Sequence, residues 1–168
     1  MPDPIEDASG GIDAAHFRTV LGHFPTGVTV ITAKGDDGPA GLAVGSFFSV
    51  SLDPPLVGFC PNKASSNWPG IKAAGAFCVN ILAEDQEDVC RVFAAKGGDK
   101  FAGIGWHPSS TGSPSLNDVL AWIDCEIEAV HDAGDHEVCI GRVKELDVER
   151  HRDGPLVFFR GGYGRFEL

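Results

Sequence analysis

Short apolar runs separated by turn residues make up most of the chain, and their composition is typical of β-strands. Residues 28–32 are all β-branched, and residues 123–129 alternate apolar with mostly acidic side chains, as in a strand with one buried face. The alternation changes phase near Gly141, which predicts a β-bulge. A turn at residues 36–38 predicts that the next segment pairs back as a hairpin. The predicted strands are residues 28–32, 40–50, 56–60, 77–82, 123–129, 136–143 and 155–160.

Three segments have helical character. Asp13 offers an N-cap to a first helix, which extends to Leu21. Residues 65–74 predict a second short helix, and residues 84–95 predict a third one with an apolar face and an acidic first turn. Residues 97–118 are rich in Gly, Pro and Ser, and we expect a long connection there without regular structure.

These six or seven strands and two or three short helices follow one another mostly in hairpin order. That order predicts a mainly β protein, an antiparallel β-barrel with helical decoration, rather than a βαβ fold. The 22 Gly and 11 Pro residues agree with many turns. We expect a loose N-terminal arm at residues 1–12 and one domain at residues 13–168.

Composition narrows the classes of partner. The chain carries 13 Lys and Arg against 24 Asp and Glu, a formal net charge of −11, which argues against nucleic acid. No apolar run approaches the roughly 20 residues of a membrane helix, and the acidic N-terminus does not resemble a secretory signal. The five cysteines form no CxxC pair, which favours reduced thiols. We therefore expect a cytoplasmic protein that binds neither nucleic acid nor membrane.

The common catalytic motifs are absent from the sequence: there is no GxSxG, no phosphate-binding P-loop, no HExxH and no GxGxxG that opens a helix. Residues 131–136 contain two histidines and two aspartates. Neighbouring side chains around a tight turn diverge, and no third ligand is suitably spaced, so we expect a polar hairpin turn and no metal.

Two segments on either side of the strand at 56–60 carry candidate binding chemistry. Residues 39–55 include small side chains that let a flat ligand lie against the backbone, although a tightly packed barrel strand explains the same pattern. Residues 60–66 place Lys63 and two hydroxyls near a predicted helix start, which suits a phosphate; plain N-capping beside a solvated lysine is the alternative. Because both segments flank one strand, a shared site is favoured.

Seven segments occur in the order and form that resemble the flavin-reductase family, the small components of two-component flavin-dependent monooxygenases. They are residues 24–32 (FPTGVTVIT), 46–57 (SFFSVSLDPPLV), 62–66 (NKASS), 77–82 (FCVNIL), 99–101 (DKF), 134–136 (GDH) and 141–143 (GRV). The resemblance extends from about Phe17 to Tyr163. Residues 99–104 (DKFAGI), 123–125 (IDC), 130–132 (VHD) and 159–161 (FRG) most resemble reductases that serve aromatic hydroxylases, including the one in bacterial steroid-ring degradation. Relatives of that type continue past the Gly-x-Tyr segment, after which this chain ends at Leu168.

The resemblance implies a split antiparallel β-barrel that works as a homodimer. It also implies reduction of FMN or FAD by NADH or NADPH, with the reduced flavin supplied to a partner monooxygenase. The ring system is expected along Gly41 to Ser46, and the phosphate at Ser65 and Ser66. The nicotinamide is expected near both His136, the implied catalytic residue, and the segment from Arg160 to Tyr163. The implied cofactor-binding residues are Pro39, Ala40, Gly41, Leu42, Ala43, Gly45, Ser46, Phe47, Ser49, Cys60, Pro61, Asn62, Ser65, Ser66, Arg160, Gly161, Gly162 and Tyr163.

Two other functions fit the same residues: a split-barrel protein that holds FMN tightly and reduces another substrate, and a non-catalytic flavin-binding protein. Between residues 130 and 165 the arginines are dispersed and form no evident cluster for a 2′-phosphate, which favours NADH over NADPH. These arginines are Arg142, Arg150, Arg152 and Arg160.

Overall fold

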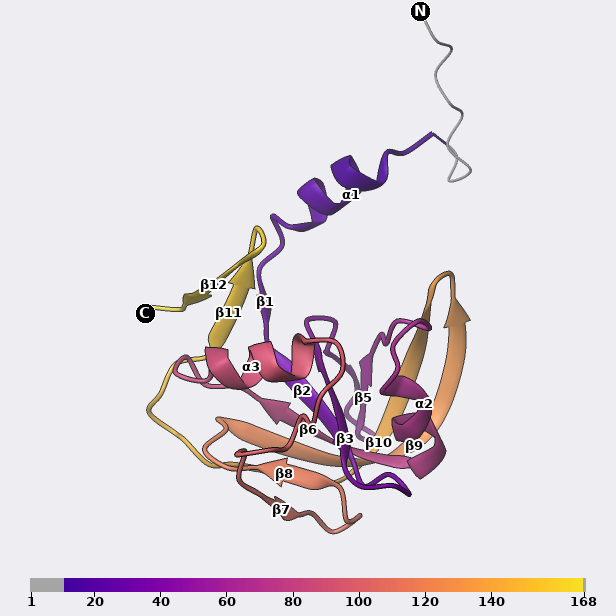
Figure 1. The fold of residues 1–168 in the computed structure, drawn as a ribbon, viewed down its shortest axis with the longest axis vertical. Coiled ribbons are helices and arrows are strands. Elements are labelled where there is room, and N and C mark those ends of the chain that lie inside the picture. Colours follow the sequence, from indigo (N-terminus) through magenta and orange to yellow (C-terminus); the bar gives the residue numbers. More distant parts are fainter. Residues whose placement is uncertain (1–10, 168) are drawn as a thin grey trace, which may run out of the picture.

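The computed structural model describes residues 11–167, so all of the predicted arm except Gly11 and Ile12 lies outside the described residues. The helices in this range are α1 (Ala14–Leu21), α2 (Trp68–Ala74) and α3 (Glu87–Ala94). The strands in this range are β1 (Thr26–Gly27), β2 (Thr29–Ala33), β3 (Ala40–Val44), β4 (Phe48–Ser51), β5 (Leu56–Phe59), β6 (Ala76–Ile81), β7 (Trp106–Pro108), β8 (Pro114–Leu116), β9 (Ala121–Ala133), β10 (His136–Val148), β11 (Leu156–Phe159) and β12 (Gly162–Arg165) (Figure 1). None of the helices within residues 11–167 has the length and apolar character needed to cross a membrane.

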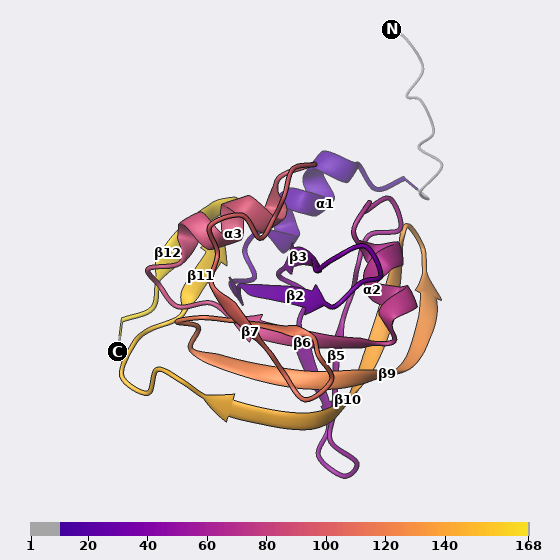
Figure 2. The ribbon, with the colours of Figure 1, turned by 60° about the horizontal axis from the view of Figure 1, so that its bottom comes forward.

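The main sheet has seven strands in the order β3-β2-β6-β9-β10-β5-β4, and every neighbouring pair is antiparallel. Its two edge strands, β3 and β4, are joined by residues 45–47 alone. Because such a link spans at most about 15 Å, the sheet has to curl until its edges approach each other. Figure 2 shows the long β9–β10 hairpin curving around the shorter strands. A three-stranded sheet (β1-β11-β12) and the β7–β8 hairpin complete the fold.

The mainly β, antiparallel architecture predicted from the pattern is confirmed, as are several of its details. The predicted turn at 36–38 joins β2 to β3, which pair from Thr29 with Val44 to Ala33 with Ala40. The predicted bulge near Gly141 is present, because the β9–β10 register shifts between Ile140 and Gly141. Asp13 caps α1, and its carboxylate accepts a hydrogen bond from the backbone N–H of His16 at 2.8 Å. Local pattern therefore located most of the strands.

Several predictions of local structure were wrong. Residues 40–50 are not one strand, since the chain crosses from one edge of the sheet to the other between β3 and β4. Residues 97–118 are not an unstructured connection, because they contain the β7–β8 hairpin. The third helix begins at Glu87 rather than at residue 84, after a turn in which the Gln86 side chain accepts from the N–H of Ala83. The described chain has twelve strands in place of six or seven, and several are only two to four residues long.

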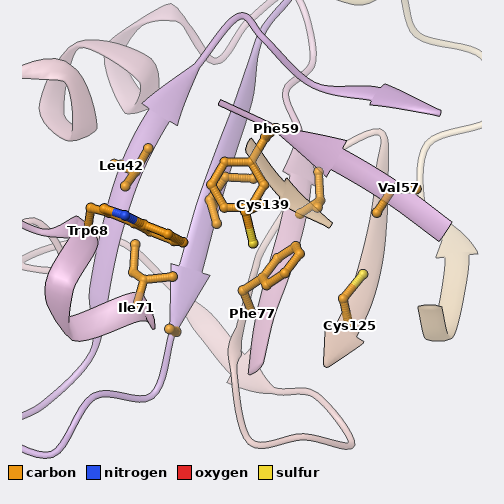
Figure 3. Packing of buried hydrophobic residues seen from close by; sticks show 11 residues of the cluster. Leu42, Val57, Phe59, Trp68, Ile71, Phe77, Cys125 and Cys139 are labelled. Carbon is orange, nitrogen blue, oxygen red and sulfur yellow. The ribbon is translucent and has the colours of Figure 1, made fainter. Parts of the chain in front are cut away.

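Two buried apolar clusters lie on either side of β3. In the first, the ring of Phe59 packs edge-to-face against Trp68 of α2 and Phe77 of β6, at centroid distances of 5.7 and 5.1 Å (Figure 3). The second contains Phe93 of α3 with Leu116 and Leu156, all nearly inaccessible to solvent. Adjacent side chains of β3 divide between them, Leu42 to the first cluster and Ala43 to the second. Helices α2 and α3 thus both pack against β3.

A buried carboxylate organises the β7–β8 hairpin. Asp124 is fully buried, although the alternation along 123–129 predicted an outward-facing side chain. Its oxygens accept four hydrogen bonds of 2.6–2.9 Å from the hydroxyls of Ser109, Ser110 and Thr111 and from the N–H of Thr111. The hairpin covers the face of the sheet that the pattern assigned to solvent, and this is why the prediction failed.

Helix α1 lies apart from the rest of the molecule (Figure 1). None of its residues is buried, and the exposed fractions of Phe17, Val20 and Leu21 are 53%, 53% and 56%. The predicted apolar face of this helix therefore exists but is not covered within one chain.

Candidate active site

A cavity of about 900 Å³ opens between the end of β3, the loop after β5 and the C-terminal end of α3. Its lining residues are Leu42, Ala43, Val44, Gly45, Ser46, Cys60, Pro61, Asn62, Ala64, Ser65, Ser66, Asn67, Phe93, Ala94, Ala95, Lys96, Ala133 and His136. The two segments that the sequence placed on either side of one strand therefore meet in one cavity, as predicted. Their contacts with a cofactor stay predictions.

The loop of residues 60–67 is held by its own backbone. The side-chain carbonyl of Asn62 accepts from the N–H of Ala64 at 2.8 Å, and the backbone carbonyl of Asn62 accepts from the N–H of Ser65 at 3.0 Å. The expected helix start at Ser65 or Ser66 was wrong, because α2 begins at Trp68. The two hydroxyls thus belong to the loop and line the cavity.

Lys63, which the sequence suggested either as a phosphate-binding cation or as a solvated lysine, points toward the β9–β10 hairpin. Its ammonium group donates to the carbonyl of Gly134 at 2.7 Å and forms an ion pair with Asp132, both at the tip of the β9–β10 hairpin. It does not line the cavity. Lys96, which follows α3, lines the cavity instead, although the sequence did not single it out.

Ser46 connects the two sides of the site. Its hydroxyl accepts from the N–H of Cys60 at 2.9 Å and lies 3.3 Å from the carbonyl oxygen of the same residue. This contact ties the β3–β4 link to the end of β5. Burial raises the pKa of the Cys60 thiol, so the thiol is protonated near neutral pH and is a poor nucleophile.

His136 is placed by the hairpin tip. It forms a β-bridge with Asn62, and the N–H groups of Lys63 and Glu137 donate to the carbonyls of Asp135 and Pro61, each at 3.0 Å. Nδ1 of His136 lies 2.7 Å from the carboxylate of Asp135, and this hydrogen bond lowers the pKa of that carboxyl group. A ring that donates its Nδ1 proton to Asp135 keeps Nε2 for contact with a ligand. The predicted polar turn at 131–136 is present as this hairpin.

Five predicted residues of the 39–55 segment do not line the cavity: Pro39, Ala40, Gly41, Phe47 and Ser49. Gly41 lies under the ring of Phe93, where a Cβ atom would be 2.6 Å from a ring carbon. Phe47 packs against the first apolar cluster, and Ser49 is exposed on β4. For Gly41 and Phe47 the alternative of tight packing describes the positions better than contact with a ligand.

The predicted residues near the C-terminus lie outside the main cavity. Arg160 and Gly161 line a separate cavity of about 390 Å³ at the base of α1, and Gly162 begins β12. Tyr163 lines a third cavity of about 150 Å³, which shares Ala43, Val44, Gly45 and Ala94 with the main one. Its hydroxyl lies 3.3 Å from Sγ of Cys90, and the guanidinium of Arg91 lies 5.0 Å from its ring centroid. His136 and Tyr163 therefore do not line the same cavity.

Comparison with known proteins gives the site its context. Residues 21–167 match the model of the flavin reductase like domain. The chain belongs to the flavin reductase family. The match covers almost all of the described residues, including every residue that lines the main cavity.

Two relatives and one solved structure of the flavin reductase family are similar to this chain over most of their own length. A flavin reductase of Pseudomonas putida is 52% identical over 162 residues, which cover 96% of this chain and 95% of the relative. The reductase subunit HsaB of a flavin-dependent monooxygenase of Mycobacterium tuberculosis (strain CDC 1551 / Oshkosh) is 52% identical over 160 residues, 95% of this chain and 86% of HsaB. The structure of the NADH:FAD oxidoreductase SgcE6 of Streptomyces globisporus C-1027, in complex with NAD and FAD fragments, is 34% identical with a TM-score of 0.87. It covers 92% of this chain and 93% of SgcE6.

Proposed function

We propose that this protein is an NADH-dependent flavin reductase that reduces FMN or FAD and releases the reduced flavin to a partner monooxygenase. The observation that carries the proposal is a cavity of the appropriate size and chemistry inside a chain that belongs to the flavin reductase family. Its volume of about 900 Å³ lies in the range of small-molecule and cofactor sites. The named activities of HsaB and SgcE6 agree with it.

The lining residues fit a flavin nucleotide. Leu42, Ala43 and Phe93 provide an apolar wall, and Gly45 also lines the cavity. The hydroxyls and amides of the 60–67 loop suit the ribityl chain and the phosphate, with Ser65 as a phosphate donor. A bound flavin supplies the chemistry of accepting a hydride from a nicotinamide, and the chain itself binds and orients the two cofactors.

His136 is the residue that orients the nicotinamide. Asp135 fixes its ring through Nδ1, and Nε2 is left to donate to or accept from a carboxamide. We expect His136→Ala to raise the KM for NADH or slow reduction while the Kd for flavin changes less than about twofold. Stopped-flow reduction and a flavin titration on the same variant measure both. Weakened flavin binding with an unchanged NADH dependence contradicts this assignment.

NADH is the preferred reductant in this proposal. Of the dispersed arginines, Arg142 forms a bidentate ion pair with Glu128 at 2.7 and 2.8 Å. Arg150 is engaged by Asp85 and Asp153. These two paired guanidinium groups are poor candidates for a 2′-phosphate. Arg152 and Arg160 have no such ion pair among the described residues, so the preference for NADH rests on the pairing of the other two and on the dispersed positions of all four.

The activity is tested by following NADH oxidation at 340 nm with enzyme far below the flavin concentration. The proposal predicts that the rate depends on added FMN or FAD and saturates with each cofactor. A preparation that retains FMN and needs no added flavin supports the alternative of a tightly bound cofactor. Flavin binding without NADH oxidation identifies a carrier protein, and either result contradicts the proposal.

We also propose that the curled sheet is a split β-barrel and that the protein is a homodimer in which α1 packs on a second copy. An isolated helix of eight residues is marginal in water, yet α1 has no buried residue. Phe24 near its end is 75% exposed, and Phe158 and Phe159 of the small sheet are 38% and 43% exposed. Together with Phe17 and Leu21 these are exposed apolar side chains that we expect a twofold partner to cover.

Light scattering tests the dimer. We expect twice the chain mass of 17.7 kDa for the wild type. The double variant Phe17→Asp with Leu21→Asp places two charges on the apolar face of α1 and is expected to give a monomer. A wild-type monomer with full activity contradicts the proposal.

A further inference from the structure

The tip of the β9–β10 hairpin extends beyond its neighbours in the main sheet. Strand β6 pairs with β9 only as far as Glu126, and β5 pairs with β10 only from Cys139 onwards. From His131 to Val138 the two strands therefore pair, within the sheet, only with each other. A two-stranded ribbon is at best marginally stable by itself in water. The position of the tip, which carries His136, thus depends on contacts from outside the sheet.

The loop after β5 and helix α2 supply part of these contacts. The N–H of Glu137 donates to the carbonyl of Pro61, and the N–H of Lys63 donates to the carbonyl of Asp135, each at 3.0 Å. The carboxylate of Glu137 also accepts from the ammonium of Lys72 at 2.9 Å. These bonds hold the hairpin as far as Asp135, and none of them reaches the turn at residues 132–134.

The side chain of Lys63 reaches that turn. Its ammonium donates to the carbonyl of Gly134 at 2.7 Å and forms an ion pair with Asp132. Within residues 11–167 it is the only side chain from outside the hairpin that forms a hydrogen bond or an ion pair with residues 132–134. Because Lys63 does not line the main cavity, its ammonium holds the turn and not a ligand.

The turn in its place determines where the ring of His136 lies. Nδ1 of His136 is 2.7 Å from the carboxylate of Asp135, and Asp135 directly follows Gly134. A shift of the turn therefore moves the carboxylate that fixes the ring. Ala133 and His136, on either side of this segment, both line the main cavity. A change at the turn is thus transmitted to the wall of the site.

We propose that Lys63 is a positioning residue for the reduction step, because it locks the turn that places Asp135 and through it the ring of His136. The inference rests on the proposed function, in which His136 orients the nicotinamide. Lys63 itself contacts neither cofactor. An exposed ion pair contributes little to stability. A misplacement of about 1 Å at a reacting centre, in contrast, can slow a reaction about 100-fold, so the same contact can matter for the rate.

The test is a double-mutant cycle between Lys63 and His136. Stopped-flow reduction by NADH of the protein saturated with FMN gives the rate of reduction and its dependence on NADH, and a titration gives the Kd for FMN. Lys63→Gln is expected to slow reduction, or to raise the NADH concentration that it requires, by about three- to tenfold. The Kd for FMN is expected to stay within about twofold and Tm within about 4 °C. In the His136→Ala background the same substitution is expected to change reduction by less than about 1.5-fold, because the ring that it positions is gone.

Two further variants serve as controls. Lys144→Gln removes an ion pair to Glu126 on the same hairpin, from a lysine that is 42% exposed where Lys63 is 39% exposed. Neither residue of this pair lines the main cavity, and reduction is expected to stay within about 1.5-fold of the wild type. Lys63→Arg keeps a cation with several donors and is expected to reduce FMN within about threefold of the wild-type rate.

Three results overturn the inference. An effect of Lys63→Gln that is equally large in the His136→Ala background means that the lysine acts by another route. A loss of FMN affinity that accounts for the slower reduction assigns Lys63 to the flavin. A Lys63→Gln variant that is reduced like the wild type removes the role altogether, while a slow His136→Ala variant leaves the proposed function intact. The proposed function fails separately, and the inference with it, if NADH does not reduce FMN on the wild type.

Discussion

Replacing Asp124 by Asn tests whether a single buried carboxylate holds the β7–β8 hairpin on the sheet. The two side chains have the same shape, so the substitution changes charge and hydrogen bonding but not packing. One carboxylate oxygen accepts from the hydroxyls of Ser109 and Thr111, and the other accepts from the hydroxyl of Ser110 and the N–H of Thr111. The oxygen of an amide can still accept from the hydroxyls of Ser109 and Thr111. The NH₂ group of the amide then faces the hydroxyl of Ser110 and the N–H of Thr111, and it leaves that N–H without an acceptor.

The expected cost follows from these contacts. A buried donor without a partner costs about 1–3 kcal/mol, and the bonds that remain lose the additional strength of a charged acceptor. We expect a loss of about 2–4 kcal/mol in the free energy of unfolding. For a chain of this size that lowers Tm by about 4–16 °C.

Urea unfolding at fixed protein concentration measures the change. Glu126→Gln is the matched control, because Glu126 lies on the same strand and is exposed, with only an ion pair of 3.4 Å to Lys144. The control is expected to change stability by less than about 1 kcal/mol. An Asp124→Asn variant within about 1 kcal/mol of the wild type would show that the carboxylate is not what holds the hairpin.

Two further predictions concern Gly41 and Tyr163. Gly41→Ala places a methyl group against the ring of Phe93 and is expected to lower the free energy of unfolding in urea by about 1–3 kcal/mol. The control Gly70→Ala meets no atom closer than 3.9 Å and is expected to be neutral or stabilising. Equal effects of the two substitutions would refute the close packing at Gly41. The contact with Cys90 and partial burial raise the pKa of Tyr163 to about 12 from 10.0. The neutral phenol is therefore favoured in the folded state, and its contribution to stability is complete below pH 10 and lost as the pH rises to about 12. Because Tyr163 is the only tyrosine, its absorbance titration is unambiguous, and Cys90→Ala is expected to lower the midpoint; an unchanged midpoint contradicts the assignment.

Local patterns in the sequence were sufficient for the strands that are continuous in the chain. The β-branched run at β2 and the change of phase at Gly141 depend on neighbouring residues only, and both were predicted correctly. The break between β3 and β4 was not predictable in this way. It depends on which strands lie at the two edges of the sheet, and those edges are defined by pairings with β2 and β5.

The errors in the hairpin region have the same origin. The segments of β7 and β8 are only three residues each and lie among Pro, Gly and Ser. They are held by distant residues, since the amide oxygen of Asn80 accepts from the N–H of Leu116 at 2.8 Å. The burial of Asp124 follows from that docking and has no signal in the alternation of its own strand.

The candidate site was partly predictable. Two segments that flank β5 have to lie near each other, so a shared cavity followed from chain order alone. The direction of the Lys63 side chain did not follow from chain order, because its partners Asp132 and Gly134 lie at the tip of the β9–β10 hairpin, far away in the sequence. That Lys96 lines the cavity was not predicted, because nothing in residues 93–98 indicates that the end of α3 faces the loop after β5.

The most direct test of the central claim is an anaerobic reduction with NADH in which free flavin exceeds enzyme by a large factor, followed by ultrafiltration. The account predicts that each enzyme molecule reduces many molecules of FMN or FAD and that the reduced flavin passes through the filter. Reduction limited to one flavin per active site, with that flavin retained by the protein, would contradict it.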